Sequence, residues 1–87
     1  MKIKEGFILR EVVGKYIVVA VNDMVKEFNC LIELNETGAL LWKALEKGAE
    51  KEDLVSALLS EYDCPKEIAE KDVSLFLERL EKASLLA

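Results

Sequence analysis

The sequence predicts an α+β fold in which a three-stranded antiparallel sheet is followed by three helices. Runs rich in β-branched and aromatic residues fill the part up to position 34, which predicts strands within about 7–34. From position 36 onward the apolar residues repeat at helical spacing instead. The length of 87 residues suits one modest core, so we expect a single domain over residues 1–87.

The first two strands are predicted to form a hairpin. Phe7 to Val13 and Tyr16 to Val21 are the strand-like runs, and only Gly14-Lys15 separates them. A two-residue loop with glycine in first place is typical of a type II′ turn. We therefore expect a tight hairpin at this position.

The third strand is predicted over Cys30 to Leu34, after an ambiguous segment from Met24 to Asn29. Consecutive strands usually pair with each other, so an antiparallel meander is the simplest arrangement, and the last strand then lies at an edge. The strand period places alternate side chains on opposite faces, Cys30, Ile32 and Leu34 on one and Leu31 and Glu33 on the other.

Three helices are predicted, at about 36–47, 50–62 and 65–83. Asn35 is a favourable N-cap for the first helix, Gly48 a suitable terminator, and Pro65 suits the first position of the third helix. Trp42 is expected in the core. The third helix carries two stripes, a wide one expected to be core (Ala69, Val73, Phe76, Leu77, Leu80) and a narrow amphipathic one (Ile68, Asp72, Leu75, Arg79).

Composition argues against several classes of function. The net charge of −5 disfavours nucleic acid as a partner. The chain has no histidine, which excludes Cys–His and Ser–His–Asp catalytic sites, and we expect no enzyme activity, no cofactor and no metal. Cys30 and Cys64 are expected as small hydrophobic residues of a reduced, cytoplasmic chain, in preference to a structural disulfide. The longest apolar run, Tyr16 to Val21, is too short to cross a membrane.

Three segments carry a resemblance to a known family. Phe28 to Trp42 includes the string Leu-Asn-Glu-Thr ahead of a tryptophan-bearing helix, and it is followed by Asp53 to Tyr62 and by Asp72 to Leu80. In order and spacing these segments resemble the PqqD-like family. The resemblance implies a winged helix-turn-helix fold and a non-catalytic recognition element for ribosomally made, later modified peptides. The leader of the precursor peptide would bind, and a modifying enzyme, often a radical S-adenosylmethionine protein, would act on its core.

The resemblance also implies where the leader peptide binds: as an added strand on the third strand, with its side chains against the third helix. An edge strand can pair with an extended chain through its backbone. Leu31 and Glu33, with the narrow stripe of the last helix, would form an apolar floor bordered by both charge signs, and Phe76 would close its base. The predicted peptide-binding residues are Cys30, Leu31, Ile32, Glu33, Leu34, Asp72, Leu75, Phe76 and Arg79.

Two other functions remain open from the sequence. A winged-helix DNA-binding regulator would need a basic recognition helix, but residues 66–82 are net acidic by one. An oligomeric scaffold subunit is the other alternative, and the free sheet edge would also permit a homodimer. Met24-Val25-Lys26-Glu27 differs from the glycine-rich turn expected of pyrroloquinoline quinone members, which favours a different product.

Overall fold

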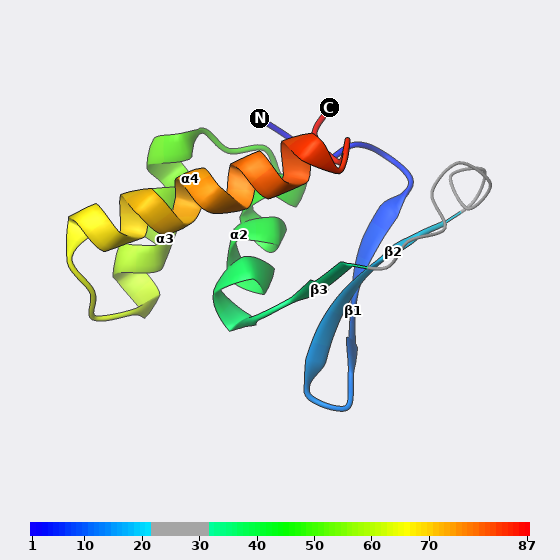
Figure 1. Cartoon of the computed structure of the whole chain (residues 1–87), viewed down its shortest axis with the longest axis horizontal. Coiled ribbons are helices and arrows are strands. Elements are labelled where there is room, and N and C mark those ends of the chain that lie inside the picture. The colour runs from blue at the N-terminus through cyan, green and yellow to red at the C-terminus, as the bar shows by residue number, and fades with distance from the viewer. Residues whose placement is uncertain (22–31) are drawn as a thin grey trace.

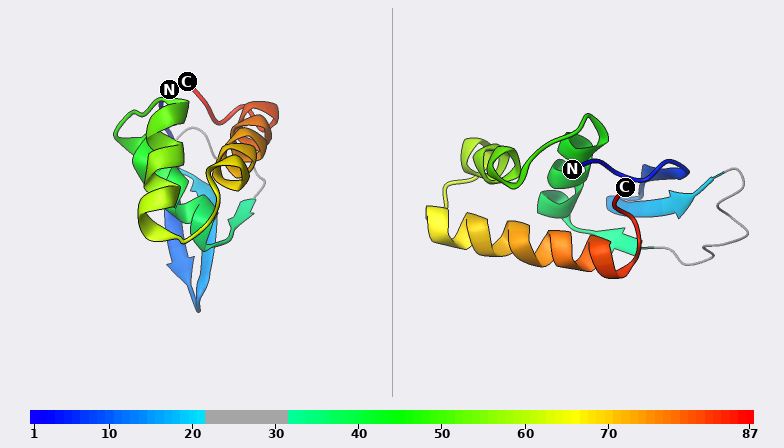
Figure 2. Two further views of the ribbon diagram at one scale, coloured as in Figure 1. Left: turned by 90° about the vertical axis from the view of Figure 1, so that its left-hand side faces the viewer. Right: turned by 90° about the horizontal axis from the view of Figure 1, so that it is seen from above.

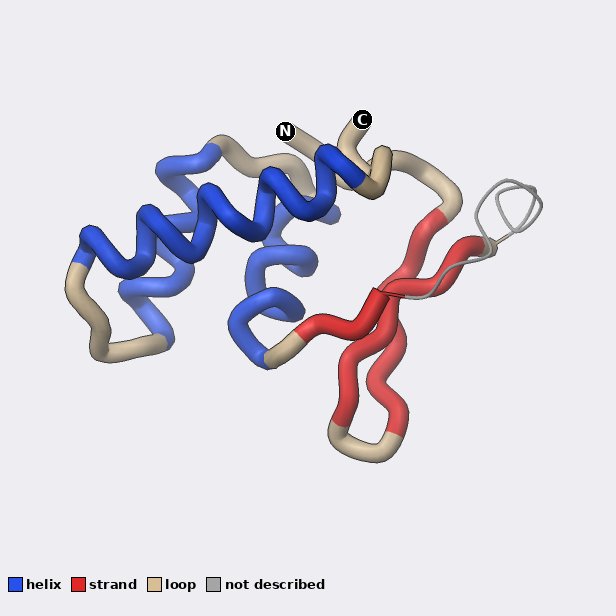
Figure 3. The backbone as a smooth tube through the Cα atoms, in the orientation of Figure 1, coloured by secondary structure: helices blue, strands red, loops and turns tan. Residues whose placement is uncertain are grey.

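The computed structural model of the chain describes residues 1–21 and 32–87. Three strands, β1 (Phe7–Val12), β2 (Lys15–Ala20) and β3 (Ile32–Leu34), precede three helices, α2 (Glu36–Glu46), α3 (Lys51–Glu61) and α4 (Lys66–Lys82). This is the predicted α+β order, with the sheet beside a cluster of helices (Figures 1 and 3). The segment Met24–Asn29 and the predicted site residues Cys30 and Leu31 lie outside the described residues.

The sheet is an antiparallel meander in the order β1-β2-β3, as predicted. β2 is the central strand: Tyr16 lies between Glu11 of β1 and Leu34 of β3. The hairpin of β1 and β2 projects away from the helices (Figure 1). The helices therefore lie next to the β3 end of the sheet, where β3 leads into α2, and the tip of the hairpin lies apart from them.

The predicted type II′ turn at Gly14-Lys15 is wrong. Val12 pairs with Lys15, so the loop residues are Val13 and Gly14, with φ angles of 49° and 77°. Positive φ at both loop residues is the type I′ turn, whose twist matches that of the flanking strands. Gly14 adopts such an angle readily, whereas a β-branched residue such as Val13 does so at a cost of roughly 1–2 kcal/mol.

The helices begin and end within a residue of the predicted limits. Asn35 caps α2, as expected, and Gly48 follows the C-cap of this helix with a φ of 91°. Pro65 differs from the prediction, because it is the N-cap of α4 and not its first helical residue. Its ψ of 146° is extended, and it caps the helix through its carbonyl oxygen, which accepts from the backbone N–H groups of Ile68 and Ala69.

The core lies between the three helices and the helix-facing side of the sheet. Trp42 is fully buried, as expected, and the predicted wide stripe of α4 is buried except for the half-buried Leu77. The sheet contributes Val18 and Leu34 to this core. Burying such apolar side chains is the dominant stabilising term of the fold.

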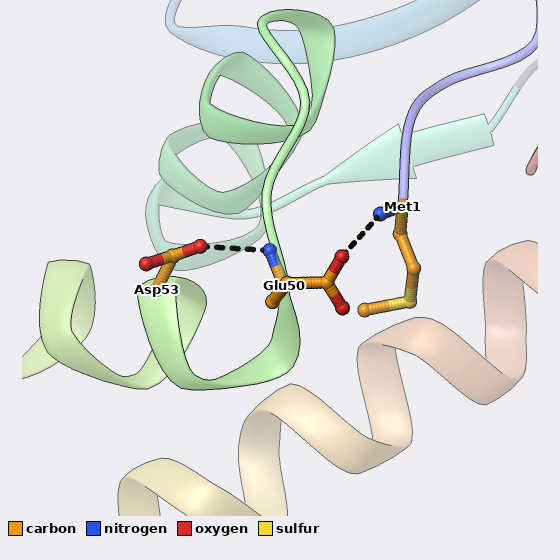
Figure 4. A network of polar contacts seen from close by, with 3 residues as sticks. All are labelled: Met1, Glu50 and Asp53. Atoms are coloured by element: carbon orange, nitrogen blue, oxygen red, sulfur yellow. Dashed lines mark hydrogen bonds and ion pairs between the residues drawn. The ribbon is translucent and has the colours of Figure 1, made fainter.

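The two ends of the chain lie side by side against the helices (Figure 2). Ile3 and Leu86 form an antiparallel bridge, and both Ile3 and Leu85 are buried in the core. At the start of α3, Asp53 accepts a 2.9 Å hydrogen bond from the backbone N–H of Glu50, whose carboxylate lies 3.4 Å from the amino group of Met1 (Figure 4). This Asp53 contact satisfies one free donor at the helix start.

Candidate functional site

The outer edge of β3 is the first component of the candidate site. β3 pairs with β2 on one side, and among the described residues no strand pairs with its other side. The directions of its backbone groups follow from the ladder. Val21 donates to the carbonyl of Gly6 at 2.8 Å, so the odd-numbered residues of β2 bond toward β1 and the even-numbered ones toward β3.

Glu33 is therefore the residue of β3 that faces outward. Tyr16 and Val18 bond toward β3, where they oppose Leu34 and Ile32. Glu33 lies opposite Ile17, which bonds toward β1, so the N–H and C=O of Glu33 point away from the sheet. Among the three residues of β3, Glu33 is the one that can offer both a donor and an acceptor to an added strand.

The junction of β3 and α2 forms one wall of the site. The Asn35 side-chain oxygen accepts hydrogen bonds of 2.8 Å from the backbone N–H of Gly38 and from the hydroxyl of Thr37. A Cβ on Gly38 would lie 3.2 Å from both this oxygen and the Cβ of Leu34. The absence of a side chain at Gly38 therefore lets the first turn of α2 pack closely against the end of β3.

A groove of about 570 Å³ lies between this junction and α4. Its apolar residues are Leu34, Leu41, Leu75 and Phe76, and its polar ones are Glu33, Asn35, Thr37, Asp72 and Arg79, with Gly38 completing the wall. Leu34 and Phe76 are buried, with 3% and 8% of their surface exposed, so they form a preorganised floor. Leu75 is 55% exposed and forms an apolar rim.

α4 contributes two charged residues to the groove, and they lie at different positions along the helix axis. Asp72 and Arg79 are two helical turns apart, which is roughly 10 Å along the axis. Arg79 donates from its guanidinium to the backbone carbonyl of Glu33 at 3.1 Å. This contact joins the C-terminal half of α4 to the outer edge of β3.

Six of the predicted site residues line this groove: Glu33, Leu34, Asp72, Leu75, Phe76 and Arg79. Ile32 is half-buried on the core side of β3 and does not line it. Among the described residues, the buried apolar lining comes from Leu34, Leu41 and Phe76. Glu33 is exposed, and its carbonyl accepts the hydrogen bond from Arg79. Phe76 is buried and lines the groove.

Sequence reasoning missed four lining residues: Asn35, Thr37, Gly38 and Leu41. The sequence predicts Asn35 only as a helix cap, and it assigns no binding role to the other three residues. The signal that could have found them is the direct passage from β3 into α2, because a helix that begins at the end of an edge strand must place its first turn beside that edge.

Within 1–21 and 32–87, no three His, Cys, Asp or Glu side chains are close enough together to hold a metal ion. Over the same residues, no helix has the length and apolar character that crossing a membrane requires.

Two solved structures share this fold. The first, described as TbiB1 in complex with the TbiA(beta) leader peptide, has a TM-score of 0.79 and 24% sequence identity, covering 99% of this chain and 94% of that one. The second, described as lasso peptide synthetase B1 complexed with the leader peptide, has a TM-score of 0.75 and 19% identity, covering 97% and 93%. At these identities the likeness concerns the fold.

No curated protein matches the chain in sequence. A family profile does match it: the family described as coenzyme PQQ synthesis protein D (PqqD) aligns with residues 18–86. The match runs from the central strand through the last helix and includes every residue that lines the groove. The chain therefore belongs to the PqqD family.

Proposed function

We propose that this protein is a non-catalytic recognition element that binds the leader segment of a ribosomally made precursor peptide and presents the peptide to a modifying enzyme. The observation that carries the proposal is the outward-facing backbone of Glu33 directly beside an apolar groove. An extended peptide needs both features, because backbone pairing supplies affinity and side-chain pockets supply selectivity.

The peptide would add to β3 as a fourth strand. A residue opposite Glu33 would exchange two hydrogen bonds with it, and antiparallel addition would continue the pattern of the sheet. The neighbours of that residue would then point to the face on which Leu34 is buried. One of them would enter the space between Leu34, Leu75 and Phe76.

The family and fold support this proposal. The two solved relatives of similar fold are each described as complexes with a leader peptide. The floor of the groove is already buried in this chain, so little side-chain freedom would be lost when a peptide binds.

The second partner in this proposal is a peptide-modifying enzyme, and the family resemblance favours a radical S-adenosylmethionine enzyme acting in the cytoplasm. A homodimer formed through β3 would compete with the leader, because both would use the same edge. A product other than pyrroloquinoline quinone remains a prediction of the sequence, since the segment Met24–Glu27 lies outside the described residues.

DNA binding is disfavoured by the state of α4. Lys66 and Lys82, two of its four basic residues, are engaged in ion pairs with Glu70 and Glu78 on the same helix. Phosphate binding depends on basic side chains that are not already neutralised locally. The helix is in addition net acidic by one over 66–82.

The proposal is tested by recovering partners of the tagged chain from its own cells and identifying them by mass spectrometry. Leu75→Glu places a charge at the groove rim, and Ile68→Glu is a matched control, since Ile68 is 48% exposed on the same helix but does not line the groove. We expect a short precursor peptide and an enzyme with the wild type and the control. Leu75→Glu should lose the peptide. Equal recovery of a peptide by Leu75→Glu, or no peptide with any form, would contradict the proposal.

A further inference from the structure

We infer that Arg79 is a displaceable cap on the β3 edge and that it selects peptides carrying an Asp or Glu two residues after an apolar residue. The inference rests on the proposed function and adds the chemistry of the preferred peptide. It starts from the hydrogen bond between the Arg79 guanidinium and the carbonyl of Glu33.

That carbonyl is the acceptor an added strand needs. Glu33 points its carbonyl outward, and in the free protein Arg79 occupies it at 3.1 Å. This hydrogen bond is exposed to solvent, so an incoming backbone N–H can replace it while the guanidinium is hydrated. In the free protein, the bound guanidinium also makes the edge less available for pairing with another copy.

Once displaced, Arg79 needs another acceptor. Among the described residues it forms no ion pair with a carboxylate, since the ion pairs of α4 join Lys66 to Glu70 and Lys82 to Glu78. A bound strand would shield the guanidinium from water, which raises the cost of leaving it unpaired. A carboxylate on the peptide is the acceptor that best matches its planar, two-pronged geometry.

Strand geometry places that carboxylate. In antiparallel addition, the residue before the one opposite Glu33 lies across from Leu34, and the residue after it lies across from Ile32. Both side chains point to the core side of the sheet. The first lies next to the apolar floor. The second lies across from the start of β3, beside which the C-terminal end of α4 passes (Figures 1 and 2), and Arg79 is in the last turn of this helix.

The opposite end of the groove has the opposite charge. Asp72 lies two helical turns before Arg79 on α4 and also lines the groove. An acidic side chain at that end would be repelled. The groove therefore orients the peptide as well as selecting its composition, with the apolar residue first and the acidic residue second.

The test is a displayed library of random 12-residue peptides, selected on purified wild-type chain and on four variants: Arg79→Gln, Arg79→Glu, Lys82→Gln and Leu75→Glu. Lys82→Gln is the matched control, because it removes one positive charge from an exposed position of the same helix. Thermal melting of each variant checks that the fold is retained. A peptide with the consensus sequence and its Asp→Asn counterpart are then compared by titration.

We expect the wild type and Lys82→Gln to enrich peptides in which an acidic residue follows an apolar one by two positions. Arg79→Gln should keep the apolar preference and lose the acidic one, and Arg79→Glu should enrich Lys or Arg there instead. The Asp→Asn peptide should bind the wild type about tenfold more weakly and Arg79→Gln equally well.

If Arg79→Gln still enriches acidic residues as the wild type does, the inference about Arg79 is wrong but the proposed function stands. The same holds if the wild type enriches apolar residues without any acidic preference. If Leu75→Glu selects the same peptides as the wild type, or no form selects a shared sequence, the proposed function itself fails. The two failures are therefore distinguishable.

Discussion

The two edges of the sheet differ in what lies beside them. β1 is six residues long, and its second half, including Arg10 and Glu11, is exposed on a hairpin that projects away from the helices (Figure 1). β3 is three residues long, is followed at once by α2, and borders a groove with a buried apolar floor. Edge strands present similar backbone groups, so neighbouring side chains decide which edge can bind a peptide selectively.

The largest expected difference between the edges is in stability. Leu34→Ala should lower the free energy of unfolding by about 2–5 kcal/mol, because Leu34 is the last residue of β3 and its side chain is buried in the core. Leu9→Ala on β1 should cost roughly 1–2 kcal/mol, because Leu9 is only half-buried. Urea denaturation of both variants measures the two values. Equal losses would show that the two edges are equally anchored to the core.

Strand addition can be blocked separately at each edge. Glu33→Pro removes an N–H that points outward from β3 without removing a bond to β2, and Glu11→Pro does the same on β1. Both replace an exposed glutamate, so the change in charge is matched. We expect Glu33→Pro to weaken binding of the recovered leader peptide by about 10- to 100-fold, which corresponds to ~1.4–2.7 kcal/mol.

Glu11→Pro should leave that affinity unchanged within about twofold, a margin that corresponds to ~0.4 kcal/mol. Fluorescence anisotropy with the labelled peptide measures both constants. If both substitutions weaken peptide binding to a similar extent, the peptide does not bind specifically at β3. If only Glu11→Pro weakens binding, the binding edge is β1.

A substitution in the hairpin turn should change the stability of the fold by a smaller amount, and it should act only on the β1–β2 hairpin. Val13 is 97% exposed with a φ of 49°, so Val13→Asn should stabilise the fold by about 1 kcal/mol, because asparagine tolerates this conformation and Asn-Gly favours the type I′ turn. Thermal unfolding should show the gain, with peptide affinity unchanged. Val12→Asn, at an exposed strand position, is the control and should give no gain.

The smallest effect concerns Tyr16, which lies between the two edges. The nearby Glu11 carboxylate is the main cause that raises the pKa of Tyr16 above 10.0, followed by desolvation. The neutral phenol is thus favoured in the folded state, and the associated stability is present below pH 10.0 and lost as the pH rises through the raised pKa. Glu11→Gln should lower this pKa in an absorbance titration, and Glu36→Gln should lower it less. No change with Glu11→Gln would contradict the assignment.

Several elements were predictable because their signals are local. Asn35 as a cap, Gly48 as a terminator and the narrow stripe with Leu75 and Arg79 depend on residues close together in the chain, and the structure confirms each position. The hairpin turn was not predicted correctly, because Gly14 fits either position of a two-residue loop. The pairing of Val12 with Lys15 decides between them.

The sequence by itself determined the order of strands and helices, their approximate limits and the amphipathic character of α4, because periodicity and capping act over a few residues. Only the tertiary structure decided the strand register that turns Glu33 outward, the approach of Gly38 to Leu34, and the placement of Arg79 on the Glu33 carbonyl. These contacts join positions as many as 46 residues apart in the chain. Packing of the shared core brings such positions together, and this packing cannot be predicted from patterns that extend over only a few residues.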